Sequence, residues 1–143
     1  MFRRPPILIV ALFACALLRP AAARDAAKPS YPAVPLLSTG KTIVGETIRY
    51  PQGDAHVTAA VVTLAPGGRT ILHKHGVPLF AYILEGTLTV NYGTHGTRTY
   101  HQGQSFMEAM AIAHFGVNNG ARPVRILAVY VGAAGAKDVI PVQ

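Results

Sequence analysis

Short apolar segments alternate with turn residues through most of this chain. From residue 41 onward, segments rich in Thr, Val, Ile and Tyr are broken by Gly and Pro at intervals of about eight to twelve residues, which is typical of an antiparallel sandwich or barrel. No segment after the first 23 residues has the length and periodicity of a helix. The predicted strands are 42–50, 56–64, 71–75, 80–84, 87–92, 97–101, 105–108, 115–118 and 124–131.

The first 23 residues read as a secretory signal peptide. Arg3 and Arg4 precede an apolar run over residues 7–18, and three alanines at 21–23 follow as a small-residue cleavage site. The run is short for a membrane span, although a short anchor or a buried helix is an alternative interpretation. We therefore expect a periplasmic or secreted protein with no membrane association once residues 1–23 are removed.

Cys15 is the only cysteine in the chain. The residues before it loosely resemble a lipobox, so a lipoprotein anchored at Cys15 is the second interpretation of this region. With the signal peptide removed, the domain has no thiol, which suits an oxidising compartment.

The charge distribution gives little support to nucleic-acid binding. The chain has 13 basic and 6 acidic residues, and loss of Arg3, Arg4 and Arg19 with the signal leaves ten basic residues, an excess of four. These charges are scattered singly, without a basic run or an aromatic stripe. A mildly basic surface is the simpler interpretation.

Three segments follow the signal peptide. Residues 24–40 contain three prolines among small and polar residues and predict an extended leader. Residues 41–133 are long enough for one barrel with a single core. Residues 134–143, rich in Gly and Ala with one late proline, predict a tail lying against the outside of this barrel.

A His-x-His pair is the main candidate for chemistry. Side chains of a strand alternate between its two faces, so His73 and His75 are expected to point to the same side. A third imidazole from another strand would complete one face of a metal coordination sphere and leave the other face open to a ligand. His114 is the candidate for this third position.

These residues resemble the cupin superfamily. Gly67, His73, His75 and Gly86 are in register with its first motif, and Gly103, His114 and Asn118 match the spacing of its second. The resemblance implies an all-β double-stranded β-helix, or jelly-roll barrel, with a metal near its middle. The sequence departs from the family pattern at three positions. Leu79 occupies the place of the motif glutamate, and Ala109 and Ala111 occupy those of a proline and a glycine.

Three neutral imidazoles leave a divalent ion its full charge, so its open positions should favour an anionic or enolisable oxygen ligand. All-nitrogen ligation suits Fe, Mn, Ni, Zn or Cu, and the sequence does not choose among these transition metals. The resemblance adds that some cupin dioxygenases cleave carbon–carbon bonds at such sites. We thus expect an exported, metal-binding, dioxygenase-like oxidoreductase acting on a small oxygen-rich molecule. The alternatives are a non-catalytic module that binds a small ligand and a metal-free barrel.

Glu108 is the candidate catalytic residue. It lies in an apolar strand, where a carboxylate should be paired, coordinated or turned to solvent. Facing inward, Glu108 would be a fourth metal ligand, a partner of an imidazole N–H, or a general base. The alternative is an exposed carboxylate on an outer strand.

Strand alternation also predicts the wall of the substrate pocket. If Leu79 points inward, the residues at two-residue spacing do so too, and Phe80 and Tyr82 point outward. Outward aromatic residues need a cover, which would be the leader, the tail or a second subunit, and a homodimer is the hypothesis that follows from the last of these. The predicted pocket residues are Leu79, Ala81, Ile83 and Phe106.

Overall fold

The structure, a computed structural model, describes residues 31–143, within which Val34–Gln143 form a compact unit. The predicted signal peptide, Cys15 and residues 24–30 of the predicted leader lie outside the described residues. Within the described part no helix is long and apolar enough to cross a membrane, and the one helical element is a 3₁₀ turn, η1 (Gly93–His95). The strands are β1 (Ala55–Leu64), β2 (His73–Lys74), β3 (Leu79–Glu85), β4 (Thr87–Asn91), β5 (Thr97–His101), β6 (Ser105–Met107), β7 (Phe115–Val117), β8 (Val124–Ala133) and β9 (Ile140–Pro141).

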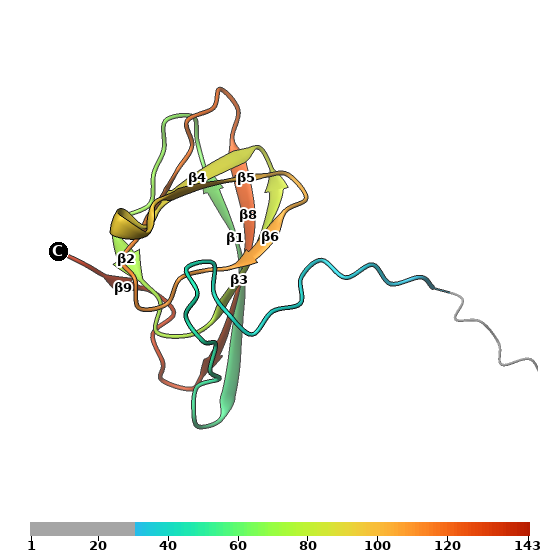
Figure 1. Ribbon diagram of the computed structural model, residues 1–143, viewed down its shortest axis with the longest axis vertical. Helices are drawn as coiled ribbons and strands as arrows, with labels where there is room; N and C mark the ends of the chain where they lie inside the picture. The colour runs from blue at the N-terminus through green and yellow to red at the C-terminus, as the bar shows by residue number, and fades with distance from the viewer. Residues whose placement is uncertain (1–30) are drawn as a thin grey trace, which may run out of the picture. The chain divides into compact units, whose positions relative to one another are not determined.

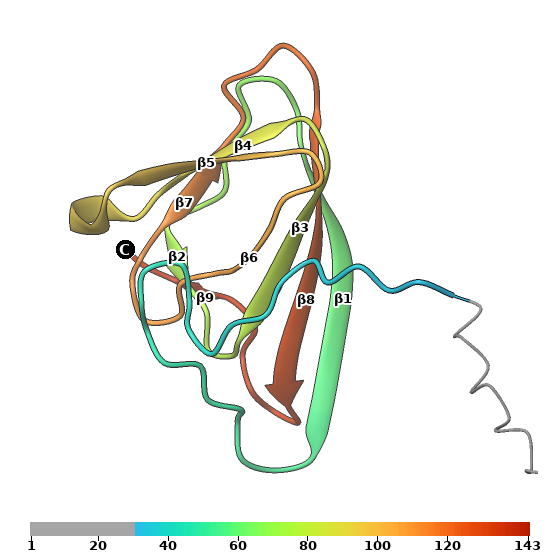
Figure 2. The same cartoon turned by 45° about the vertical axis from the view of Figure 1, so that its right-hand side comes forward.

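The strands form antiparallel sheets that face each other (Figure 1). One sheet has four strands in the order β1-β8-β3-β6, and another has three in the order β5-β4-β7. Strand β2 pairs with β9, and an isolated bridge between His73 and His114 joins it to the chain entering β7. Figure 2 shows the four-stranded sheet as one wall and β4, β5 and β7 as the other. The all-β jelly roll expected from the sequence is confirmed.

The core lies between these two walls because the strands alternate as amphipathic strands should. In β3, Leu79, Ala81 and Ile83 are buried while the residues between them are partly exposed. In β4, Leu88 and Val90 are buried and their neighbours are not. The other large buried core side chains are Leu64, Tyr92, Tyr100, Phe106, Val124 and Ile126.

Gly86 makes the tight connection between β3 and β4. Its φ of 81° lies in the left-handed region, and a Cβ on this residue would be 2.6 Å from the carbonyl oxygen of Pro123. Any other residue would therefore be both strained and in collision. This contact accounts for the glycine in the first motif.

Two predictions about flanking segments need correction. Residues 42–50 were expected to form a strand, but they form a tight turn in which the amide of Gly45 donates to the carbonyl of Thr42, with one isolated bridge from Lys41 to Thr47. The β-branched residues there predicted extension, whereas Gly45, at φ 90°, reverses the chain. The 134–143 tail is not merely laid on the surface, because it contributes strand β9.

Candidate metal centre

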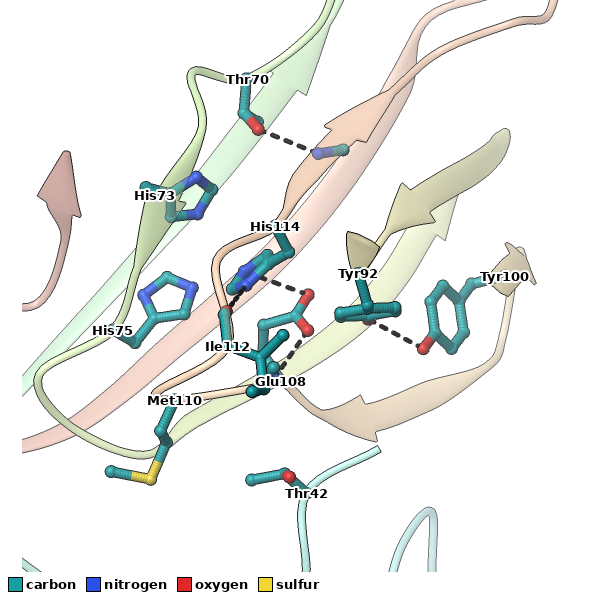
Figure 3. Close-up of polar contacts among 12 residues, drawn as sticks. Thr42, Thr70, His73, His75, Tyr92, Tyr100, Glu108, Met110, Ile112 and His114 are labelled. Carbon is teal, nitrogen blue, oxygen red and sulfur yellow. Dashed lines mark hydrogen bonds and ion pairs between the residues drawn. The ribbon is translucent and has the colours of Figure 1, made fainter. Parts of the chain in front are cut away.

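The three predicted histidines converge on one space between the sheets. His73 begins β2, His75 follows that strand, and His114 lies directly before β7. The backbone amide and carbonyl of His73 exchange hydrogen bonds of 3.0 and 2.9 Å with those of His114, which fixes the two residues side by side. The ring centroids are 4.6–5.1 Å apart, and one ligand nitrogen from each ring lies within 4.8 Å of the others (Figure 3).

Backbone carbonyls determine which nitrogen of each ring carries the proton. The Nδ1 atoms of His73, His75 and His114 lie 2.7, 2.9 and 2.8 Å from the carbonyl oxygens of Ile71, Asp138 and Ile112. A carbonyl oxygen only accepts, so each Nδ1 must carry the hydrogen, and each Nε2 of a neutral ring then presents a lone pair.

The Nε2 atoms of His75 and His114 are buried and have no hydrogen-bond partner among the described residues. Buried polar atoms without partners are rare, and a metal ion at the common centre would satisfy both. Burial also lowers the pKa of all three rings, and that of His75 falls to about 4. The rings are therefore neutral near pH 7, as metal ligation requires. On these grounds the three residues fit a divalent metal ion.

Glu108 lies beside this cluster and not on the outer surface. It follows β6 and is only 6 % exposed. One carboxyl oxygen accepts a hydrogen bond from the amide of Ala109 at 2.8 Å, and the other lies 3.9 Å from Nε2 of His114. Burial raises the pKa of Glu108 to about 7, because its effect is larger than that of the hydrogen bonds from Tyr92 and Ala109, which lower the pKa. This carboxyl is therefore poised to take up or release a proton near neutral pH.

Two buried tyrosines lie beside Glu108. The hydroxyls of Tyr92 and Tyr100 are 3.1 Å apart (Figure 3). The Tyr100 ring stacks on that of Phe106, with 3.7 Å between the ring centroids. Burial raises the pKa of Tyr92 and raises that of Tyr100 to about 12, so both hydroxyls keep their protons. The Tyr92 ring also lies 5.5 Å from the His114 ring, so Tyr92 adjoins the histidine cluster as well as Glu108.

The histidines and Glu108 open onto a cavity of about 70 Å³. Of the predicted pocket residues, Leu79, Ala81 and Phe106 line it. Ile83 does not: it is fully buried in the hydrophobic core, further along β3. The other polar lining residues within 31–143 are Thr70 and Tyr130, and this part of the chain contributes no Lys or Arg to the lining. The remaining lining residues are Val62, Leu88, Val90, Gly116, Ile126 and Ala128.

Sequence reasoning missed Glu46, which lies in the turn that was expected to be a strand. Its carboxylate accepts hydrogen bonds from the amides of Met110 and Ala111, at 2.7 and 2.8 Å, and from the Thr42 hydroxyl at 3.0 Å. The backbone held in this way continues to Ile112, whose carbonyl orients His114. No sequence pattern signals this role, because the partners of Glu46 are backbone amides 64 and 65 residues away.

The remaining polar candidates are structural or exposed. Asn118 is fully buried, donates to the carbonyls of Leu64 and Arg122 and accepts from the amide of Gly120, as expected for a turn-capping side chain. The other histidines of the chain do not contribute to the cavity, and all three are exposed: His56, His95 and His101.

Relatives in sequence agree with this architecture. Residues 60–130 match the cupin domain family. The chain is 31% identical over 108 residues to a germin-like protein, subfamily 2 member 2, of Arabidopsis thaliana. That match covers 71% of this chain and 49% of the germin-like protein, so the chain spans about half the length of this relative.

Solved structures share the fold. The polyketide cyclase RemF of Streptomyces resistomycificus matches with a TM-score of 0.53 and 22% identity, over 64% of this chain and 63% of that one. An oxalate decarboxylase of Lactobacillus farciminis, in a formate complex, matches with a TM-score of 0.52 and 24% identity, over 60% and 26% of the two chains. An oxalate oxidase matches with a TM-score of 0.52 and 22% identity, over 60% of this chain and 46% of that one. The family match over residues 60–130, the paired sheets and the clustered histidines together support assignment of this barrel to the cupin superfamily.

Proposed function

We propose that this protein binds a divalent transition metal through His73, His75 and His114 and acts as a dioxygenase-like oxidoreductase on a small oxygen-rich organic molecule. The observation that carries the proposal is the pair of buried Nε2 atoms without partners, aimed into a cavity that also holds a proton-exchanging carboxyl. When bound, the metal supplies Lewis-acid and redox chemistry. The structure does not select among Fe, Mn, Ni, Zn and Cu.

The charge of the cavity favours an anionic ligand. Three neutral imidazoles add no negative charge, and Leu79 stands where a ligating carboxylate would otherwise neutralise the ion. None of the described lining residues is a Lys or Arg, so the metal itself would attract an anionic oxygen. Oxalate, named for two proteins of the same fold, is a molecule of this kind.

The size of the cavity limits the substrate. A cavity of about 70 Å³ holds only a few water-sized groups. Its walls are mostly apolar side chains held between two sheets, which do not yield easily. The substrate is therefore either a molecule of a few heavy atoms or a longer one that inserts only its reacting end.

Glu108 is the proposed general acid or base. Its carboxyl lies 3.9 Å from Nε2 of His114 and is almost fully buried, so it is next to any ligand bound at the cluster. A pKa of about 7 lets it both accept and return a proton at neutral pH, which a carboxyl of ordinary pKa does poorly.

Metal analysis and oxygen uptake test the proposal. Purified protein should bind about one ion per chain, and His73→Ala should lose it while His56→Ala, a change at an exposed histidine, should not. Protein loaded with Fe(II), Mn(II) or Cu(II) is then assayed for oxygen consumption with small keto acids, diketones and catechols. Unchanged metal content in His73→Ala would refute the site.

A non-catalytic binding module is the second candidate. The small apolar cavity and the leucine at the glutamate position suit ligand capture as well as turnover. Tight binding of a small anion to the loaded protein, with no oxygen consumed and no product released, would favour this module over the enzyme.

We also propose a homodimer formed through the outer face of the four-stranded sheet. The strand register places mostly apolar side chains on this face, with Arg125 at its edge. Two of these side chains, Val57 and Val61, are 59 and 49% exposed. The described leader lies against β6, where the Leu36 carbonyl accepts a hydrogen bond from the Ser105 hydroxyl at 2.8 Å, and leaves Val57 and Val61 on β1 exposed. The apolar residues of the outer face are Val57, Ala59, Val61, Phe80, Tyr82, Met107, Leu127, Val129 and Val131, and Thr63 and Ser105 lie on the same face.

A second copy is the occupant that this face fits, because a two-fold axis lets one apolar, uncharged surface pack on itself. Sedimentation should give a dimer that Val61→Lys converts to a monomer. Tyr50→Lys, a change at a 74% exposed residue outside the sheet, should leave it dimeric. A wild-type monomer would instead point to the leader as the cover.

We propose export to the periplasm or beyond on the basis of residues 1–23. N-terminal sequencing of protein recovered from the periplasmic or culture fraction should begin near residue 24. A lipid-modified N-terminus at Cys15 would favour the lipoprotein alternative.

A further inference from the structure

Residues 134–143, here called the strap, pair with the strand that carries the His-x-His motif. In the β2–β9 ladder His73 is opposite Pro141 and Lys74 is opposite Ile140, and the amide of Val142 donates to the carbonyl of Leu72 at 3.0 Å. Figures 1 and 2 both show β9 beside β2. The strap therefore supplies the hydrogen-bonded partner strand of β2, which has only 2 residues.

The strap also sets one of the three imidazoles. His73 and His114 each donate from Nδ1 to the carbonyl two residues earlier in their own segment. His75 instead donates to the carbonyl of Asp138, which is 63 residues away and lies in the strap. Two rings are thus oriented locally, whereas the third depends on a separate piece of chain.

Close packing holds the strap at this place. A Cβ on Gly76 would lie 2.4 Å from the carbonyl oxygen of Lys137 and 3.4 Å from the side chain of Ile140. At the other end the amide of Ala134 donates to the carbonyl of Asp54 at 2.8 Å. The residue after His75 is therefore a glycine that lets the strap approach the histidine strand.

We propose that the strap is a positioning element for the metal centre: by accepting the Nδ1 hydrogen of His75 on the Asp138 carbonyl, it holds the Nε2 lone pair toward His73 and His114. The inference rests on the proposed function for its metal-binding consequence. The orientation of the ring itself is testable without metal. Displacement of the strap frees His75 to rotate or to change tautomer, and leaves a two-histidine site.

Two variants displace the strap by different means. Gly76→Ala introduces a Cβ into the Lys137 carbonyl, and Gly40→Ala, where no atom lies within 4 Å of the added Cβ, is its control. Val142→Pro removes the amide that bonds Leu72, and Val142→Ala, which keeps that amide, is its control. Hydrogen exchange of residues 137–142 reports whether the strap has moved, and Val142→Pro keeps the test available if Gly76→Ala does not fold.

The readouts are imidazole nitrogen NMR of the metal-free protein and Zn(II) affinity by competition. The displaced variants should lose the Nδ1–H signature of His75 alone and bind Zn(II) about 10–100-fold more weakly, as is typical when a hydrogen-bond partner of a ligand is lost. An unchanged His75 signature, or unchanged Zn(II) affinity, in a variant with a displaced strap would overturn the inference. Wild-type protein that binds no Zn(II) or other divalent metal would refute the proposed function, and the His75 signature would still decide whether the strap orients the ring.

Discussion

Glu46→Gln isolates the contribution of the turn that holds the His114 segment. The carboxylate of Glu46 accepts two backbone N–H groups and one hydroxyl, whereas an amide side chain offers only one oxygen as acceptor. Hydrogen bonds to charged groups contribute about 1.5–3 kcal/mol each, and partial exposure of Glu46 to solvent reduces this. We expect a loss of about 1–2 kcal/mol in the free energy of unfolding at pH 7.

The effect of Glu46 should depend on pH in a defined direction. Burial opposes the charged form, but the hydrogen bonds from Met110, Ala111 and Thr42 outweigh burial and lower the pKa of Glu46 below its ordinary value of 4.5. A lowered folded pKa stabilises the protein above that ordinary value, and this stability is lost as the pH falls through the folded pKa. The difference between wild type and Glu46→Gln should therefore shrink on acidification.

Urea unfolding at pH 7 and at several values below 4.5 measures both effects, with Asp54→Asn, a change at an exposed carboxylate, as control. Thermal unfolding of Glu46→Gln should show a Tm lower by roughly 4–10 °C. Because the Met110–Ile112 backbone orients His114 and binds the amide of His75, Zn(II) affinity should fall as well. A Glu46→Gln variant whose free energy of unfolding stays within about 0.5 kcal/mol of wild type at every pH would refute this role of Glu46.

Three further predictions concern the cavity. Glu108→Gln should keep the metal but lower kcat by about 10²-fold or more and remove the acid limb of the pH–rate profile, whose kinetic pKa should lie below the metal-free value of about 7; a profile that keeps this limb would exclude Glu108 as its source. Leu79→Glu should tighten metal binding and weaken the affinity for small anions, because the added carboxylate neutralises the ion. Calorimetry with a series of anions measures this, and an anion affinity that is unchanged or higher in the variant would show that charge does not govern binding. In Glu108→Gln, which lacks the linked carboxyl, Zn(II) affinity should not fall steeply near pH 6.5, because burial lowers the pKa of all three rings and that of His75 to about 4; Zn(II) titrations of this variant with a steep loss near pH 6.5 would contradict this.

The sequence predicted the parts of the site that depend on local periodicity. Two-residue alternation placed His73 and His75 on one side, and motif spacing brought in His114, whose ligand nitrogen the structure places within 4.8 Å of the other two. The same alternation correctly placed Leu79 and Ala81 on the inner face of β3. Ile83 is on the predicted face but is packed in the hydrophobic core and does not line the cavity, although its cross-strand partner Ile126 does.

The contacts that orient the histidines could not be predicted, for a physical reason. The amides that donate to Glu46 and the Asp138 carbonyl that accepts from His75 are backbone groups. Such groups are present whichever residue type occupies the position. Residue type therefore gives no signal, and the partners are more than sixty residues apart. Strand propensity gave a wrong prediction for residues 42–50, because Gly45, at φ 90°, turns the chain there despite its β-branched neighbours.

The exchange of a motif glutamate for Leu79 changes the electrostatics of the site more than its shape. A carboxylate at that position would be a permanent ligand, whereas Glu108 approaches from the end of β6 and has a pKa of about 7. A cation at the histidine cluster would favour the charged form of Glu108, so metal binding and proton release by this carboxyl are linked. Glu108 would thus remain able to exchange protons with a ligand, and the cavity beside Leu79 contains no second carboxylate among the described lining residues. This combination suits proton-coupled chemistry on a small anion better than it suits a purely structural metal, whose coordination would be closed.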